Sequence, residues 1–530
     1  MKTFLLTTLL SLLSMGSVAQ PSTHTTEIAI LTDEYWWGGV VALGSQMPYI
    51  QPLRTIDLSR DGYNNQLVPL LLSNKGRYVW SDHPFKFSVN GKVITLESDT
   101  ELPVVQTAGK TLRDAYMDAC GKHFKPSGTL PDSLFFSMPQ YNTWIELMYN
   151  QNQTDILKYA HGIIDNDFPR GVLMIDDNWQ KHYGNFEFKP ERFADPKGMV
   201  EQLHAMGFKI MLWICPFVSP DSPEYRELSR KGYLIKSKRG GPAIINWWNG
   251  QSACYDLTNP DAAAYLVNQL KEMQRTFGID GFKFDAGDPG LYASPDLVSY
   301  RKDATSVDHC EAWARIGLEF PFNEYRACWR MGGQPLVQRL GDKNNDWKAV
   351  QALIPDMLAA GLLGYAYTCP DMIGGGQYAS YINIDQSKIN QELIVRSAQV
   401  HALMPMMQFS VAPWRILNQE NLHTLCRLAH LHQEMGGYIM QYARHAAQTG
   451  EPIVRHLEYQ FPGQGFDECK DQFMLGDKYL VAPMVKSGTV RTVVLPKGNW
   501  RDERGKKYRG GRAYSIDVPL NRLPYFEQLK

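Results

Sequence analysis

One pattern repeats between residues 131 and 416: a short apolar run ends in polar, acidic or aromatic residues, and a helical stretch often follows. Helical stretches such as 195–208 and 259–278 separate several of the runs. This alternation is typical of parallel βα units. Eight runs fit the pattern, at residues 133–144, 171–179, 209–217, 281–287, 321–327, 335–342, 364–371 and 403–410. Eight such units predict a (β/α)8 TIM barrel, whose functional side chains gather at the C-terminal ends of the strands.

An open doubly wound sheet is the alternative fold for the same α/β pattern. It would need a glycine-rich phosphate loop after the first strand, and that loop is missing from the sequence. We therefore expect the barrel over residues 131–450. Short alternating runs with a turn at Asn90-Gly91 predict an N-terminal β-sandwich over residues 20–130. Similar short runs predict a small C-terminal β-sandwich domain, or two of them, over residues 451–530.

The first residues have the pattern of a leader. Lys2, an apolar stretch and the small residues Ser17-Val18-Ala19 predict a signal peptide over residues 1–19. The stretch is shorter than the roughly 20 apolar residues of a membrane span. We therefore expect an exported protein, periplasmic or secreted, without a membrane anchor. Export permits disulfides, but the eight cysteines are spread out and buried free thiols are favoured. The formal net charge of -1 gives no sign of nucleic-acid binding.

Polar and aromatic residues at the predicted strand ends form one candidate pocket. They are Trp144, Asp176, Asp177, Trp213, Lys283, Asp285, Arg326, Asp342 and Asp371. The strand ends carry no histidine, which excludes a Ser/His/Asp arrangement, and the chain has no Cys/His spacing for zinc. Carboxylates alone can bind Mg²⁺ or Ca²⁺, but the neighbouring tryptophans and cations argue against a metal.

Two carboxylates in an aromatic-lined, open-topped pocket suit glycoside hydrolysis. One carboxylate must be an ionised nucleophile, and the other must carry the proton that it donates to the leaving oxygen. Nearby cations keep the first ionised, whereas an apolar setting or the nucleophile's own charge keeps the second protonated. This chemistry requires no cofactor.

The stretch from 278 to 290 contains three acids and one lysine. Lys283 and Asp285 are two residues apart on a predicted strand, so both face the same side. Asp280 precedes the strand in an Asp-Gly turn signal and is expected to be structural. Asp288 follows a tight turn, where it either orients Asp285 or caps the next segment. A Schiff-base role for Lys283 is a rival hypothesis, but the adjacent acid would keep the amine protonated.

Other candidates have structural alternatives. Arg326 could pair with Glu324, and Asp346 competes with Asp342 for the second carboxylate. The three tryptophans, Trp144, Trp213 and Trp248, could each be barrel packing. The case for Trp248 is strongest, because it lies in a loop segment between predicted strands.

Several blocks, in order, resemble glycoside hydrolase family 31: "WWGG", "DGFKFDAGD", "RLGDKNNDW" and "LPKGNW". The resemblance covers nearly the whole chain after the leader. The blocks "IDDNW", "LWICPFV", "WWNG", "FKFDAG", "MQFSVAPWR" and "GEPIVRHL" are most similar to the branch that contains the animal myogenesis-regulating glycosidase. That branch is associated with α-galactosidase-type activity.

The resemblance implies roles for individual residues. Asp285 matches the nucleophile, Asp342 the general acid/base, and Arg326 the sugar-binding arginine sixteen residues before it. Asp176 matches a sugar-binding aspartate with Asp177 beside it. Trp248 and Lys283 match subsite residues of the closer branch.

One stretch departs from the glucose-specific members, which place a sugar-binding histidine after the eighth strand. Here that position is Ser410, which is too short to reach as histidine would. The expected function is therefore a retaining exo-α-glycosidase, with an α-galactoside favoured over an α-glucoside or α-xyloside. The expected partner is an oligosaccharide or small α-glycoside, and the oligomeric state stays open. A non-catalytic carbohydrate-binding relative is the alternative of another class.

Overall fold

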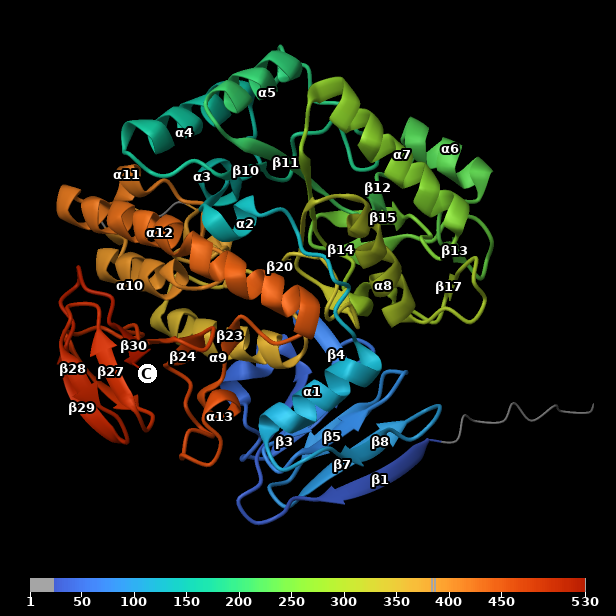
Figure 1. Ribbon diagram of the computed structural model, residues 1–530. Coiled ribbons are helices and arrows are strands. Elements are labelled where there is room, and N and C mark those ends of the chain that lie inside the picture. The colour runs from blue at the N-terminus through green and yellow to red at the C-terminus, as the bar shows by residue number, and fades with distance from the viewer. Residues whose placement is uncertain (1–22, 383–384, 386–387, 530) are drawn as a thin grey trace, which may run out of the picture.

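The computed structural model describes residues 23–382, 385 and 388–529 (Figure 1). The predicted signal peptide lies outside the described residues. Among the helices in the described ranges, none combines the length and apolar character that a membrane crossing requires. All eight cysteines are described and are free thiols. Six of them are buried, while Cys426 and Cys469 are partly exposed.

The N-terminal domain is rich in antiparallel sheet, as predicted. One sheet has the order β1 (His24–Ala29), β7 (Val93–Ser98), β6 (Lys86–Val89) and β3 (Leu53–Asp57). The other is built on β4 (Gln66–Ser73), which pairs with β2 (Trp36–Val40) and β5 (Arg77–Trp80), and β8 (Val104–Thr107) continues it. The strand β19 (Cys328–Trp329), from the barrel region, adds to β4 in parallel.

Eight parallel strands form the barrel sheet, and each lies within one of the predicted runs. Their order is β21 (Thr368–Cys369), β20 (Gln338–Arg339), β18 (Phe322–Tyr325), β16 (Gly281–Phe284), β11 (Lys209–Ile214), β10 (Val172–Ile175), β9 (Gln140–Asn142) and β22 (Gln408–Phe409). A parallel bridge between Met372 and Gln408 joins the two ends. The sheet therefore closes, which places the strand ends around one mouth.

Helices lie between most successive barrel strands and cover the barrel (Figure 1), whereas β18 and β20 are joined by a described segment that contains only β19. The helices are α4 (Gln153–Asp165), α5 (Pro196–Ala205), α7 (Pro260–Phe277), α8 (Ser306–Ile316), α9 (Trp347–Leu362), α10 (Gln391–Ala402) and α12 (Gln419–Thr449). A long excursion between β11 and β16 contains α6 (Pro223–Lys231) and the hairpin of β14 (Ile245–Trp247) and β15 (Gly250–Cys254). Trp248 lies in the turn of that hairpin.

The first predicted strand run differs from the structure over half of its length. Residues Leu134–Ser137 form the short helix α2, and strand β9 begins only at Gln140. Phe135 and Phe136 are fully buried in this helix. A short apolar run does not distinguish a buried strand from a buried helix, which explains the difference.

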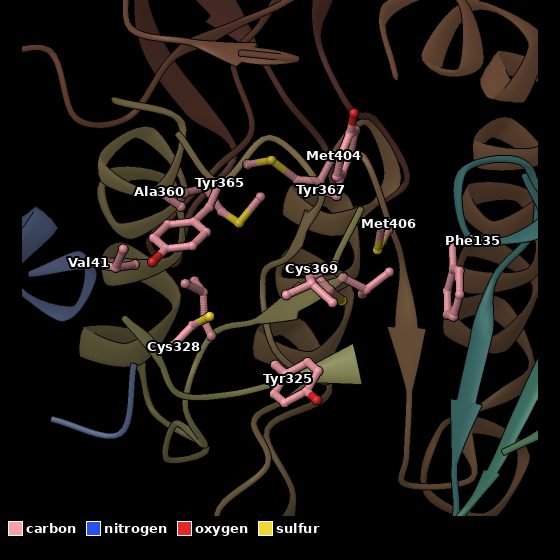
Figure 2. Close-up of a cluster of buried hydrophobic side chains, with 14 of the residues drawn as sticks. Val41, Phe135, Tyr325, Cys328, Ala360, Tyr365, Tyr367, Cys369, Met404 and Met406 are labelled. Carbon is pink, nitrogen blue, oxygen red and sulfur yellow. The ribbon is translucent and has the colours of Figure 1, made fainter. Parts of the chain in front are cut away.

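One apolar core joins the barrel to the N-terminal domain. Figure 2 shows Val41, from the 3₁₀ segment Val41–Gln46, beside Tyr365 and Ala360 of the barrel region. The same segment packs so closely on α9 that a side chain at Gly44 would meet the backbone of Pro355 at 2.3 Å. Because the two domains share buried side chains, the loops of the N-terminal domain are held firmly near the barrel mouth.

The C-terminal domain has its own core around the fully buried Trp500. Its main sheet has the order β23 (Val454–Arg455), β24 (Phe473–Leu475), β25 (Tyr479–Val481), β30 (Tyr525–Leu529), β27 (Asn499–Asp502) and β28 (Lys507–Arg509). The strands β26 (Val490–Leu495) and β29 (Arg512–Asp517) pair antiparallel in a separate two-stranded sheet. The prediction that short strands form a C-terminal β domain is therefore confirmed.

Candidate active site

A cavity of about 190 Å³ opens at the C-terminal ends of the barrel strands. It is lined by Asn64, Trp144, Tyr149, Asp176, Asp177, Trp213, Trp248, Lys283, Asp285, Arg326, Asp342, Gln377 and Tyr378. Nine of the eleven residues predicted for the site are in this set, and the two carboxylates Asp285 and Asp342 share it. The volume is below the roughly 300–1,000 Å³ of pockets for drug-sized ligands, so it suits one small polar group such as a single sugar ring.

Asp285 follows β16 directly, and its carboxylate accepts hydrogen bonds from three donors. Its Oδ1 accepts from the Arg326 Nε at 2.9 Å and from the Ala286 backbone N–H at 2.8 Å. Its Oδ2 accepts from the Trp213 Nε1 at 2.8 Å. Burial alone would raise the pKa of Asp285, but the Arg326 and Lys283 charges and the bonds from Arg326 and Trp213 lower that pKa well below its ordinary value. Asp285 is therefore an ionised carboxylate in a largely buried site.

Arg326 is itself oriented by a second carboxylate. Its two terminal nitrogens donate to both oxygens of Asp288, at 2.9 and 3.3 Å. Asp288 makes no capping bond to the 3₁₀ segment that follows it, so of the two roles predicted for Asp288 the structure supports orientation, acting through Arg326. The predicted alternative pair of Arg326 with Glu324 is wrong, because Glu324 contacts Arg339 and Gln408 instead.

Lys283 lines the cavity with Asp285, as their shared face predicts, but its ion-pair partner is Asp176. The Nζ of Lys283 lies 2.6 Å from the Asp176 Oδ2, and both side chains are buried. Burial would lower the pKa of Lys283, but the charge of Asp176 raises it overall. A lysine held protonated in this way is a poor nucleophile, which argues against the Schiff-base hypothesis.

Asp280 has the structural role that the sequence indicates. Its carboxylate binds His204, Lys209 and the backbone N–H of Ile210, at 2.7 to 2.8 Å. These contacts tie helix α5 and strand β11 to the start of β16. Asp280 is outside the cavity lining.

Asp342 follows β20, and its side chain keeps 34% of its surface exposed. Its Oδ1 accepts from the Arg339 Nη1 at 2.8 Å. The competing carboxylate, Asp346, is the N-cap of α9, where its side chain accepts from the Ala349 backbone N–H at 2.7 Å. Asp346 is therefore explained by helix capping, and Asp342 is the carboxylate that faces the cavity.

Two predicted site residues lie outside the cavity lining. Asp371 is fully buried and has φ of 91°, so its side chain turns away toward Arg339 and the backbone N–H groups of Lys343 and Gly376. Ser410 is also buried, and its hydroxyl accepts from the backbone N–H of Ile145 at 2.7 Å. Both residues are at strand ends, as predicted, but their polar atoms are engaged by the protein.

Asp177 has an unusual setting. Its Oδ2 accepts from the Asn249 amide at 2.7 Å and from the Tyr183 hydroxyl at 3.2 Å. Its Oδ1 is buried and has no hydrogen-bond partner within the described part of the chain. Burial and the neighbouring charge of Asp176 raise the pKa of Asp177 to about 7, against the bonds from Asn249 and Tyr183 that lower it.

Aromatic side chains form the walls. Trp144 donates its indole N–H to the Gly376 carbonyl at 3.0 Å and packs edge-on against Tyr149 and Tyr378. Trp248 is 50% exposed, and its ring lies 5.1 Å from the Arg326 guanidinium carbon. This exposure agrees with the prediction that Trp248 belongs to the site, and it argues against the alternative that Trp248 is part of the barrel packing. Flat ring faces of this kind suit the apolar faces of sugars.

The sequence analysis did not predict four residues that line the cavity: Asn64, Tyr149, Gln377 and Tyr378. Three of them lie in loops after barrel strands, where only a residue's place after a strand end could have suggested a role. Asn64 comes from the N-terminal domain, where its positive φ of 61° marks a tight turn. The adjacent Asn65 accepts from the Gly341 N–H at 2.9 Å. The N-terminal domain therefore contributes to the wall beside Asp342.

Within the described residues, one group of side chains has the spacing to hold a metal ion. It is Asp167, Cys426 and His430, on the loop after α4 and on α12. These residues are not part of the cavity lining.

An eight-stranded parallel barrel with two carboxylates in an aromatic-lined pocket at its mouth defines the glycoside hydrolase type of site. Comparison with known families agrees. The TIM-barrel domain of glycosyl hydrolases family 31 matches residues 136–420, and the C-terminal domain of the same family matches residues 450–528. The chain belongs to glycosyl hydrolase family 31.

Individual relatives fit this family. The myogenesis-regulating glycosidase of Mus musculus is 30% identical over 421 residues, which cover 76% of this chain and 58% of the relative. An alpha-xylosidase of Emericella nidulans is 25% identical over 493 residues, covering 86% and 61% of the two chains. This chain thus spans about three-fifths of the length of both relatives. The structure of a dextranase of Flavobacterium johnsoniae complexed with glucose superposes with a TM-score of 0.83 at 20% identity, over 96% of this chain and 67% of that one, and shows the shared fold.

Proposed function

We propose that this family 31 enzyme is a retaining exo-α-glycosidase that removes terminal α-linked sugars from oligosaccharides or small α-glycosides. One observation carries the proposal: an aspartate held ionised by Arg326 and Trp213 shares a small cavity with a second, partly exposed carboxylate, Asp342. A non-catalytic sugar-binding relative has no need of this pair, and the cost of burying Asp285 in ionised form favours catalysis.

The chemistry follows from these positions. Asp285 attacks the anomeric carbon and forms a glycosyl ester, while the bond from that carbon to the leaving oxygen breaks and Asp342 donates its proton to that oxygen. Asp342, now a carboxylate, then takes a proton from water, and the water oxygen displaces Asp285. Two displacements return the sugar with its α configuration.

The preferred sugar is proposed to be α-galactose. Two features support this. Several sequence blocks resemble the branch of the myogenesis-regulating glycosidase, which is 30% identical over 421 residues. Ser410 also stands where the glucose-specific members have a histidine. Alpha-glucosidase and alpha-xylosidase are among the similar proteins, so α-glucosides and α-xylosides are the alternatives.

Parallel assays of nitrophenyl α-galactoside, α-glucoside and α-xyloside test the proposal. We expect turnover of the α-galactoside with the highest kcat/KM, and the α-anomer as the first sugar released in proton NMR spectra. The matched β-glycosides serve as controls and should be inert. Release of the β-anomer would contradict the retaining mechanism, and failure of all three α-glycosides would contradict the proposed activity.

Asp177 makes sugar binding depend on pH. Its pKa is raised to about 7, so its carboxyl is neutral below that pH and an ionised acceptor above it. A charged acceptor binds a sugar hydroxyl more strongly than a neutral one. We expect the inhibition constant of the released monosaccharide to fall by roughly threefold to tenfold as the pH rises from about 6 to about 8.

The matched variant is Asp177→Asn, which is neutral at every pH and close to the same size. It should bind the monosaccharide with an inhibition constant that is independent of pH over the same range. If Asp177→Asn kept the pH dependence of the wild type, another group would be responsible.

A further inference from the structure

A fully buried arginine beside the proposed acid/base plays no part in the mechanism described so far. Arg339 is 1% exposed and lies at the end of β20, three residues before Asp342. A single nitrogen, Nη1, lies 2.8 Å from both the Asp342 Oδ1 and the Asp371 Oδ1. On its other side, the Arg339 Nε lies 3.5 Å from a carboxylate oxygen of the buried Glu324. Burying a charge is costly unless it is well paired, so three carboxylates around one arginine require an explanation.

The donor chemistry of arginine decides how Asp342 is arranged. A guanidinium has five N–H donors and no acceptor. The oxygen of Asp342 that receives the Arg339 bond must therefore act as an acceptor, and cannot hold a proton pointing toward Arg339. The proton that a general acid donates is thus assigned to the other oxygen, Oδ2.

Asp371 in turn holds Arg339 in place. Its second oxygen accepts from the backbone N–H groups of Lys343 and Gly376, at 2.9 and 3.0 Å. These bonds join the loop after β20 to the loop after β21. The backbone of Asp371 has φ of 91°, a conformation that is unfavourable for a residue with a side chain and is often retained at functional sites.

The loop at Gly376 shows how closely these groups are packed. A side chain there would lie 2.8 Å from the Oδ1 atoms of both Asp342 and Asp371. The Gly376 carbonyl also accepts from the Trp144 indole in the cavity wall. The carboxyl of Asp342 is therefore fixed from one side by Arg339 and the glycine loop, while its other side faces the cavity.

We propose that Arg339 and Asp371 are positioning residues that fix the carboxyl of Asp342, so that Oδ2 carries the transferred proton toward the leaving oxygen of the sugar. The proposal rests on the glycosidase function proposed above. The positioning role explains why Asp371 lies at a strand end without lining the cavity. It also explains why a charged residue, Arg339, is buried three residues before the acid/base Asp342.

Asp371→Asn is the most informative variant. Asparagine has the same shape, tolerates a positive φ, and can still accept a backbone N–H. Its neutral side chain removes one of the three charged partners of Arg339 and leaves Asp342 and Glu324. The measured quantity is the ratio of kcat/KM for two aryl α-glycosides of one sugar, a dinitrophenyl and a methoxyphenyl glycoside. The methoxyphenyl group is the poorer leaving group, so its release depends on proton donation.

This ratio does not depend on how much of a preparation is folded, because both substrates report on the same active molecules. We expect Asp371→Asn to lower kcat/KM for the methoxyphenyl glycoside by roughly tenfold or more relative to kcat/KM for the dinitrophenyl glycoside. Asp342→Ala should change the ratio in the same direction. Arg339→Lys should also change it, because one ammonium group cannot reproduce the fork of the guanidinium. The control is Asp502→Asn, which removes a buried carboxylate paired with Arg522 in the C-terminal domain and should leave the ratio unchanged.

The outcomes separate this proposal from the proposed function. If the wild type hydrolysed neither substrate, the glycosidase function would fail. If the wild type hydrolysed both and Asp342→Ala changed the ratio, while Asp371→Asn and Arg339→Lys kept the wild-type ratio, the positioning role alone would be overturned.

Discussion

Replacing Asp285 by alanine is expected to reduce kcat/KM for an activated aryl α-glycoside by roughly 10⁴-fold or more. The variant lacks the atom that attacks the anomeric carbon, and nothing else in the cavity is placed as a substitute. The groups that bind the Asp285 carboxylate are donors: Arg326, Trp213 and the backbone N–H of Ala286. Without Asp285, the positive charge of Arg326 keeps a partner in Asp288, so we expect the variant to fold.

Azide gives this prediction a sharper form. A small anion can occupy the space that the Asp285 carboxylate leaves, and it then attacks the substrate from the same face. One displacement inverts the anomeric centre, so Asp285→Ala with azide should produce a β-glycosyl azide from an α-glycoside. The control is Asp280→Ala, which removes a carboxylate outside the cavity and should neither need azide nor form this product. Wild-type rates in Asp285→Ala would show that another residue is the nucleophile.

Asp342→Ala is expected to have an effect that depends on the leaving group. For a poor leaving group, loss of the general acid should lower kcat/KM by roughly 10²- to 10⁴-fold. For a dinitrophenyl leaving group, which departs without protonation, formation of the glycosyl ester should be much less affected. Its hydrolysis should still slow, because Asp342 also activates the water, so the ester should accumulate and give a burst of released phenol.

The second prediction has its own azide test. Azide needs no general base, so in Asp342→Ala it should attack the ester on Asp285 directly. This is the second inversion, and the product should be an α-glycosyl azide, opposite to the product of Asp285→Ala. The matched control is Asp346→Ala, which removes the helix cap of α9 and should affect stability more than the leaving-group dependence. If the two substrates lost equal activity in Asp342→Ala, its role as the acid would be excluded.

The barrel was predictable because its strands obey simple rules. An inward-facing residue at the end of a parallel strand lies at the barrel mouth, and this placed Asp176, Lys283, Asp285, Arg326 and Asp342 around one cavity. The family resemblance added which carboxylate attacks. Neither required knowledge of the side-chain contacts.

Contacts between distant segments were not predictable in the same way. The spacing of Lys283 and Asp285 correctly put them on one face, but the partner of Lys283 is Asp176, which is 107 residues away. Asp371 was expected in the pocket, yet its left-handed backbone turns its side chain toward Arg339. A local pattern does not reveal a positive φ in a residue other than glycine, nor a bond made across the barrel.

The loops show the same limit. Tyr149 and Tyr378 reach the cavity from segments without a regular pattern, and Asn64 comes from another domain. Helix α2 occupies the first third of the first expected strand, because burial of Phe135 and Phe136 is compatible with a helix as well as a strand. Sequence patterns therefore predict which residues stand at the strand ends, but not which loop residues complete the wall of the cavity.

Trapping the glycosyl ester tests the central claim most directly. A fluorinated α-glycosyl fluoride of the sugar that the enzyme hydrolyses should inactivate the wild type, and mass spectrometry of the digested protein should find one sugar on the peptide that contains Asp285. Asp342→Ala, in which Asp285 is intact, should carry the label on the same residue, and Asp285→Ala should carry none. A label on a different carboxylate, or full inactivation of Asp285→Ala by the same reagent, would contradict the assignment of Asp285 as the nucleophile.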